Sequence, residues 1–245
     1  MSNIRISVPE KLKKFNPISL NKNDCHYLIR VMKITNDTIV KAFNAKDGEW
    51  NCNIIIDHKQ SVNIIPFERT KSALKKSKII LAFSLIKRQK ISFVIQKATE
   101  LNIKAIYPLI VDRSTVRTIN SNRMHIIAKE SSEQCGRLDI PTINTLSTLE
   151  NLLKENVNHQ FIICHNCNDA IDIGMLNKKM NYNKDTIVLI GPEGGFSSKE
   201  TSYFQFLNLL FVRLSHLTLR AETAALVAIS SIQNFYHSSN NVNFE

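Results

Sequence analysis

The sequence lacks the features of secreted and membrane-spanning proteins. Its five cysteines, an odd number at irregular spacing in 245 residues, do not form the pattern of a disulfide framework. No apolar run approaches the roughly 18 residues that a membrane-spanning helix needs. The first eight residues also lack the apolar core of a secretory signal. We therefore expect a cytoplasmic protein.

Acidic residues are outnumbered, and the imbalance is confined to one part of the chain. The 32 lysines and arginines exceed the 21 aspartates and glutamates, which gives a net charge of +11. Residues 1–140 carry 25 basic and 12 acidic residues, whereas residues 141–245 carry 7 and 9. A localised positive field suits a polyanionic partner, chiefly nucleic acid, although solvated lysines alone would give the same composition.

Metal-binding motifs are also absent. Cys164 and Cys167 form one Cys-x-x-Cys pair around His165, but a structural zinc site usually needs four ligands and no second pair exists. We expect two ordinary cysteines and no metal, and His165 receives little weight as a cleft residue.

The first 70 residues indicate a small β-rich unit with one helix. Strands are expected at 38–43, 50–57 and 61–67, separated by turn-forming residues. Asn23 or Asp24 can cap a short helix that continues to about residue 32. The polar, lysine-rich segment 69–78 is the expected linker.

From residue 78 onward, apolar runs alternate with helical segments. The runs lie at 79–86, 106–111, 161–164, 187–190 and 210–214. The clearest helix places five apolar residues on one face: Ile91, Val94, Ile95, Ala98 and Leu101. Alternating strands and helices predict a mainly parallel α/β sheet, whose ligands bind beyond the carboxyl ends of the strands.

Half of the chain's six glycines lie just after the run 187–190. Residues 190–197 read IGPEGGFS, and Ser197 with Glu200 has the form of a capping box that opens a helix. Glycines at such a strand end allow a ligand to approach the backbone, although a purely structural tight turn remains an alternative. The spacing is neither that of a P-loop nor that of a dinucleotide-binding loop. On this interpretation, Gly194→Val would fill the space of the ligand.

A second unusual stretch follows the last strand run. Residues 214–226 read LSHLTLRAETAAL and open an apolar helix that runs to about residue 235. Arg220 and Glu222 are costly near the start of a buried helix unless they are paired with each other or used in function.

Together these residues resemble a known family. The segments GPEGGFS at 191–197 and LRAETA at 219–224 resemble the paired signature of the bacterial 16S ribosomal RNA uridine-N3 methyltransferases, which belong to the trefoil-knotted SPOUT class. Residues 96–101, 112–114 and 133–137 resemble further blocks of that family in the same order, as do residues 5–6 and 30–33. The chain departs from the family at 215–217, where Ser-His-Leu replaces the usual Gly-Pro-Arg.

The resemblance implies an α/β fold: a small PUA-like β-barrel for RNA at residues 1–72, followed by a SPOUT methyltransferase domain at 73–245. It implies a homodimer that uses S-adenosylmethionine to methylate N3 of a specific uridine in 16S ribosomal RNA or the small ribosomal subunit. The transfer would be in line, to a flipped-out base. Because N3 of uracil is protonated, catalysis must stabilise the developing anion, a task that suits arginine.

The implied site residues fall into three sets. The catalytic candidates are Arg220, Arg113 and Glu222, of which Glu222 could orient Arg220 or accept a proton. The cofactor-binding candidates are Ile190, Gly191, Glu193, Gly194, Gly195, Leu214, Ser215 and Leu219. The RNA-binding candidates are Arg5, Arg30, Lys33, Lys87, Arg88, Lys90 and Arg137.

Two other functions compete with this interpretation. Related knotted enzymes methylate a ribose 2′-hydroxyl, but they usually have Ser-Leu-Asn where this chain has Thr218-Leu219-Arg220. The chain could instead be a non-catalytic RNA-binding assembly factor, against which the intact glycine loop argues.

Overall fold

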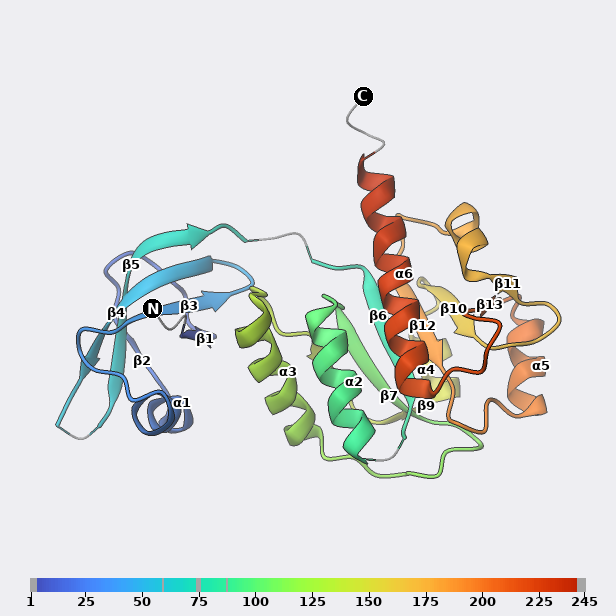
Figure 1. The fold of residues 1–245 in the computed structure, drawn as a ribbon, viewed down its shortest axis with the longest axis horizontal. Helices are drawn as coiled ribbons and strands as arrows, with labels where there is room; N and C mark the ends of the chain where they lie inside the picture. The colour runs from blue at the N-terminus through green and yellow to red at the C-terminus, as the bar shows by residue number, and fades with distance from the viewer. Residues whose placement is uncertain (1–3, 59, 74–75, 87, 242–245) are drawn as a thin grey trace. The chain divides into compact units, whose positions relative to one another are not determined.

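The structure is a computed structural model that describes residues 4–58, 60–73, 76–86 and 88–241. The chain forms two compact units (Figure 1): Met1–Lys75 with Ser132–Ile140, and Lys76–Ser131 with Pro141–Glu245. The domain boundary expected between residues 72 and 73 stays a prediction. Within the described ranges, no helix is both long enough and apolar enough to cross a membrane.

The first unit is built on a five-stranded sheet with the order β1-β3-β4-β5-β2. Strand β1 runs parallel to β3, and the other pairs are antiparallel. The strands are β1 (Arg5–Ser7), β2 (Ile18–Ser19), β3 (Ile39–Asn44), β4 (Gly48–Ile56) and β5 (Val62–Lys71). The three expected strands are confirmed, but β5 continues into the expected linker because Arg69 pairs with Trp50 and Lys71 with Glu49.

The short helix of this unit begins earlier than expected. Helix α1 (Lys22–His26) is capped by Asn21, whose side chain accepts a hydrogen bond of 3.0 Å from the backbone N–H of Asp24. The prediction of a cap at Asn23 or Asp24 is therefore wrong, because several residues of the capping type follow one another here. The helix continues as a π-helical turn over Tyr27–Val31.

The second unit contains a parallel sheet with the order β11-β13-β10-β12-β6-β7-β8, and β9 also pairs with β7. Its strands are β6 (Ile79–Ser84), β7 (Ala105–Ile110), β8 (Thr142–Ile143), β9 (Ser147–Thr148), β10 (Gln160–Cys164), β11 (Ile171–Asp172), β12 (Thr186–Ile190) and β13 (Leu210–Arg213). All five predicted strand runs are confirmed. Their apolar residues are buried on both faces of the sheet, as in a covered parallel sheet.

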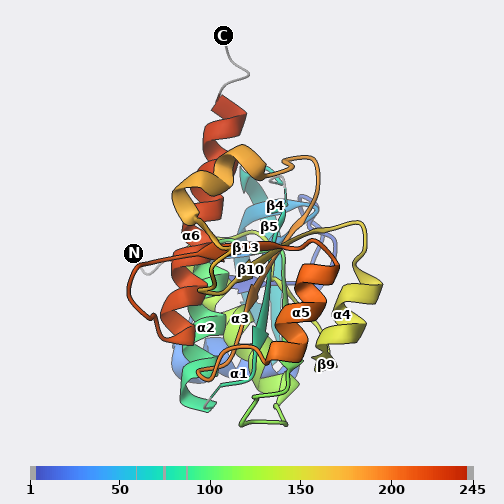
Figure 2. The same ribbon diagram turned by 90° about the vertical axis from the view of Figure 1, so that its right-hand side faces the viewer.

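Helices cover both faces of this sheet, with α2 and α6 on one side and α4 and α5 on the other (Figure 2). The helical segments are α2 (Arg88–Glu100), α3 (Ser121–Cys135), α4 (Leu149–Glu155), a 3₁₀ turn (Ile173–Lys179), α5 (Ser198–Phe206) and α6 (Ala221–Asn241). The apolar face predicted for α2 is buried, except for Leu101, which follows the end of the helix. Helix α6 runs further than the expected residue 235.

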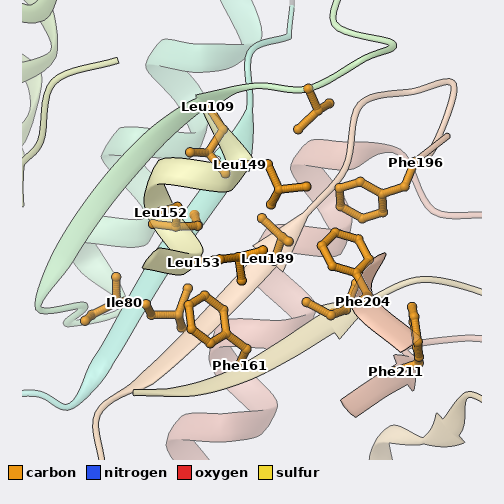
Figure 3. Close-up of a cluster of buried hydrophobic side chains, with 14 of the residues drawn as sticks. Ile80, Leu109, Leu149, Leu152, Leu153, Phe161, Leu189, Phe196, Phe204 and Phe211 are labelled. Carbon is orange, nitrogen blue, oxygen red and sulfur yellow. The ribbon is translucent and has the colours of Figure 1, made fainter. Parts of the chain in front are cut away.

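Figure 3 shows the core between the sheet and the α4–α5 layer. Alternate residues of the central strands, such as Ile80 and Leu189, point into this layer and meet Leu152, Phe204 and Phe196. Fully burying a side chain of this size contributes roughly 1.5–3 kcal/mol. The core therefore fixes the position of β12, and with it the loop that leaves its carboxyl end.

Candidate functional site

Three loops that follow neighbouring parallel strands meet at one cavity. Strand β10 lies between β12 and β13, and Cys164 is opposite both Ile190 and Val212, so the three strands end within one residue of the same level. The cavity measures about 200 Å³. It is lined by Cys164, His165, Asn166, Ile190, Gly191, Pro192, Glu193, Gly195, Phe196, Val212, Arg213, Leu214, Ser215, Leu217, Thr218, Leu219, Ala221 and Ala224.

The glycine loop is held by hydrogen bonds at its exit. Ser197 caps α5 with the predicted capping box: its hydroxyl accepts from the N–H of Glu200 at 3.2 Å, and the Glu200 carboxylate accepts from the N–H of Ser197 at 2.8 Å. The same two side chains reach Asp112 after β7, because Glu200 accepts from its N–H at 2.9 Å and Ser197 donates to its carboxylate at 2.6 Å. This bonding fixes the exit of the loop against the neighbouring strand end.

The three glycines differ in what their surroundings allow. Gly195 has a φ of +68°, a conformation that side chains with a Cβ rarely adopt. A Cβ on Gly191 would lie 3.1 Å from the ring of Phe196. A Cβ on Gly194 would instead make ordinary contacts of 3.6 and 3.7 Å with the side chain of Arg113. Gly191 and Gly195 line the cavity and Gly194 does not, so the expectation that Gly194→Val would fill the space of the ligand loses its support.

In the loop after β13, Ser215 stands where the family usually has glycine. Ser215 has no positive φ, so this position does not need glycine. Its hydroxyl also accepts a hydrogen bond of 3.1 Å from the N–H of Leu217, which closes a local turn. Leu217 lines the cavity yet is 77% exposed.

Arg113 and His165 lie beside the glycine loop. The exposed guanidinium of Arg113 donates a hydrogen bond of 2.7 Å to the carbonyl of Gly194. The His165 ring meets the Phe196 ring edge-on at 5.9 Å between centroids. Burial, and then the positive charge of Arg113, lower the pKa of His165, so the imidazole in the cavity wall is neutral at neutral pH. His165 thus lines the cavity, and the sequence signal for it is its place directly after a strand run.

Arg220 lies at the rim of the cavity, between the lining residues Leu219 and Ala221. Its side chain is exposed. The alternative interpretation, in which Arg220 pairs with Glu222, is wrong, because Glu222 forms its ion pair with Lys90 of α2 at 3.0 Å. Burial opposes ionisation of Glu222, but a backbone hydrogen bond, Lys90 and Arg220 together lower its pKa. Glu222 is therefore an anion that ties the first turn of α6 to α2.

Two of the predicted RNA-binding residues are used inside the first unit. The Arg5 guanidinium is buried and donates to Glu49 at 2.7 Å and to the carbonyls of Ser132, Glu133 and Arg137 at 2.6–2.9 Å. Arg137 is also buried and pairs with Asp139 at 2.9 Å. Because these guanidinium groups are enclosed and occupied, the expectation that Arg5 and Arg137 contact RNA is corrected to a structural role.

Of the other predicted RNA-binding residues, some are exposed, one is paired within the protein, and two have side chains outside the described residues. Arg30 and Lys33 are exposed in the first unit, and Arg30 donates to Gln60 at 3.1 Å. Lys90 is engaged by Glu222. Lys87 and the side chain of Arg88 lie outside the described residues.

Among the residues that the structure describes, no three His, Cys, Asp or Glu side chains gather as metal ligands. Burial raises the pKa of the Cys164 thiol to about 12, so this cavity residue stays protonated at neutral pH.

Two protein families match the chain. The RNA methyltransferase domain family matches residues 73–233, and the RNA methyltransferase PUA domain family matches residues 20–67. The ribosomal RNA small subunit methyltransferase E of Rickettsia conorii is 30% identical over 231 residues, which is 94% of each chain. The protein of the same name from Bacillus subtilis is 23% identical and covers 91% of this chain and 92% of its own.

Two solved structures are similar over almost the whole chain. A Legionella pneumophila methyltransferase in complex with S-adenosylmethionine has a TM-score of 0.86 and 26% identity, and the match covers 96% of this chain and 98% of that one. Ribosomal RNA small subunit methyltransferase E of Neisseria gonorrhoeae, also bound to S-adenosylmethionine, has a TM-score of 0.84 and 24% identity, with the same coverage.

Proposed function

The chain belongs to the ribosomal RNA small subunit methyltransferase E family, and we propose that it methylates N3 of a specific uridine in 16S ribosomal RNA. The expected α/β fold, an RNA methyltransferase domain preceded by a PUA-like domain, is confirmed by the family matches and the structural similarity. We propose that the methyltransferase domain has the trefoil knot of the SPOUT class. The cofactor is S-adenosylmethionine, which both similar structures contain. The observation that carries the proposal is the cavity where the glycine loop meets the loop that ends in Arg220.

The cavity suits this cofactor. Its walls combine apolar side chains with polar groups and loop backbone, and Gly191 and Gly195 leave the backbone accessible. Glu193 adds a carboxylate, while the Arg213 guanidinium in the wall is held by Asn166 and Asp172. A neutral His165 does not repel a cationic ligand. Ile190, Gly191, Glu193, Gly195, Leu214, Ser215 and Leu219 would hold the cofactor. When bound, it supplies an electrophilic methyl group on a sulfonium.

Arg220 and Arg113 are assigned to the uracil. Both side chains are exposed beside the cavity, where a base that enters from solvent can reach them. Their guanidinium groups stay charged and donate in a fixed fork, which suits the anion that develops as N3 attacks the methyl group. The bond from Arg113 to Gly194 orients Arg113 at the edge of the cavity.

Glu222 is assigned a positioning role in preference to proton transfer. Its carboxylate is ionised and is held by Lys90 through contacts of 3.0 and 3.2 Å. Its negative charge in the first turn of α6 also interacts favourably with the helix dipole. Glu222 thereby fixes the start of α6, which carries Ala221 and Ala224 in the cavity wall.

We assign RNA binding to residues 1–72 and methyl transfer to residues 73–245. The PUA match at 20–67 and the exposed Arg30 and Lys33 support the first assignment. We propose a cytoplasmic homodimer acting on 16S RNA or the small subunit, with the site near the subunit interface. The exposed apolar Leu217 at the cavity supports a partner there.

The test is nucleoside mass spectrometry of 16S RNA from cells that lack the protein. We expect loss of 3-methyluridine, restoration by the parent gene, and no restoration by Arg220→Ala. Unchanged 3-methyluridine together with loss of a 2′-O-methylated nucleoside would favour ribose methylation instead.

A further inference from the structure

An exposed aromatic ring lies at the tip of a lysine-rich loop in the first unit. Phe15 is 67% exposed. The loop is anchored at both ends by the buried Leu12 and Ile18. Lys11, Lys13 and Lys14 around the ring are all exposed. The ring therefore points to solvent from a well-anchored base within a positively charged segment.

The backbone holds Phe15 in a conformation that this residue type rarely adopts. Its φ is +61°, and its N–H donates to the carbonyl of Pro66 at 2.7 Å. The N–H of Asn16 donates to the carbonyl of Lys13 at 3.0 Å, which makes Phe15 the third residue of a tight turn. Glycine or asparagine fits such a position without strain, whereas a bulky side chain is strained. Strained residues of this kind concentrate at functional sites.

The ring already accepts a cation on its face. The Lys14 ammonium lies 5.1 Å from the ring centroid. Proteins that bind single-stranded nucleic acid combine positive charge along the backbone path with aromatic faces on which bases stack. Here three lysines and one exposed ring supply both components within five residues.

We propose that Phe15 is a stacking platform for an unpaired base of the RNA substrate, and that the flanking lysines contact the adjacent phosphates. This inference rests on the proposed function. It adds Phe15 and its neighbouring lysines to Arg30 and Lys33, the RNA-binding residues already proposed for the first unit. The chemistry selects single-stranded RNA, because a base inside a duplex does not expose its face to a side chain.

The test measures binding of the full chain to a mixed-sequence single-stranded RNA of about 12 nucleotides, within the usual site sizes, and to the same RNA as a duplex. Phe15→Asn removes the ring and places at +61° a residue that tolerates this φ. We expect single-strand affinity to fall about tenfold, duplex affinity to stay the same, and the melting temperature to stay the same or rise. Unchanged single-strand affinity would overturn the proposal, whatever happens to the melting temperature.

Two further variants sharpen the test. Phe15→Trp keeps an aromatic face, so affinity should be retained and the new indole fluorescence, measured against the parent with Trp50, should be quenched by RNA. Phe206→Ala removes another ring, 80% exposed on α5, and should leave RNA affinity unchanged. A loss of affinity for Phe206→Ala equal to that of Phe15→Asn would show a general surface effect and contradict the proposal.

Methylation of 16S RNA by the parent protein separates this inference from the proposed function. If the parent methylates RNA but Phe15→Asn binds single strands as tightly as the parent, only the stacking proposal is wrong. If the parent does not methylate RNA but Phe15→Asn weakens binding, the proposed function is wrong and the stacking platform stands.

Discussion

At the scale of single residues, methyl transfer depends most on Arg220. Its side chain is exposed at the rim of the cavity, so its removal has little effect on packing. If it stabilises the uracil anion, its interaction is stronger in the transition state than in the ground state. Arg220→Ala should then lower single-turnover methylation about a hundredfold, equivalent to roughly 3 kcal/mol, without changing the melting temperature.

Arg220→Lys provides the finer comparison, because it keeps the charge and loses the planar fork. We expect it to remain seriously impaired. Arg123→Ala, which removes another exposed arginine, should methylate like the parent at saturating RNA. Near-parental turnover of Arg220→Ala would exclude Arg220 from catalysis and leave Arg113 as the candidate.

We expect cofactor binding to depend on pH through His165. Its pKa is lowered by burial and by Arg113, so it lies below the ordinary value of about 6.5. The neutral form predominates above that pKa, and protonation at lower pH places a cation beside a cationic ligand. Calorimetric titration should therefore show affinity for S-adenosylmethionine that is steady from about pH 7.5 to 6.5 and falls at lower pH.

His165→Gln is the matched variant, since glutamine stays neutral at every pH. It should bind the cofactor at neutral pH and show a smaller loss of affinity in acid. The same acid profile in the variant and the parent would mean that another group causes the pH dependence.

The roles of some single residues could not be predicted from the sequence. Arg5 has the same type and charge as an RNA-binding arginine, but its partners are Glu49 and three carbonyls more than 120 residues away. No local pattern predicts such contacts, because tertiary packing alone brings these residues together. The pairing of Lys90 with Glu222 is equally invisible to local patterns, because Glu222 lies on another helix.

At the scale of elements, the glycine loop is the part that the sequence predicted best. A buried strand, a glycine-rich turn and a capping box are all local signals, and the structure contains each of them. The buried parallel strands could be predicted equally well from the sequence, because they are apolar throughout. The roles of the individual glycines could not be predicted from the sequence. They depend on Phe196 and Arg113, which lie near Gly191 and Gly194 only in the folded structure.

Matched substitutions in this loop test its role. Gly195→Ala forces a side chain into a φ of +68° at the cavity wall, whereas Gly194→Ala makes only ordinary contacts. We expect Gly195→Ala to weaken S-adenosylmethionine binding by tenfold or more, about 1.4 kcal/mol, and Gly194→Ala to bind like the parent. If calorimetry shows that both variants bind the cofactor as tightly as the parent, the loop does not contact the cofactor.

At the scale of the whole molecule, charge and chemistry are divided along the sequence. The excess of basic residues lies in residues 1–140, and the cavity for the cationic cofactor is built from residues 164–224, where the charge is nearly balanced. This division suits an enzyme that attracts RNA with one part and binds a sulfonium with another. Composition alone predicted the division of charge. The resemblance predicted the two-domain methyltransferase, whereas periodicity gave only an α/β sheet and a β-rich unit.

The most direct measurement is the site of methyl transfer itself. The purified chain is incubated with S-adenosylmethionine carrying a deuterated methyl group and with 16S RNA from cells that lack the protein, and the digested nucleosides are analysed by mass spectrometry. We predict that the label appears in 3-methyluridine at a single position and that Arg220→Ala transfers about a hundredfold less in one turnover. Label on a ribose oxygen or on another base, or no transfer by a protein that binds both substrates, would contradict the account.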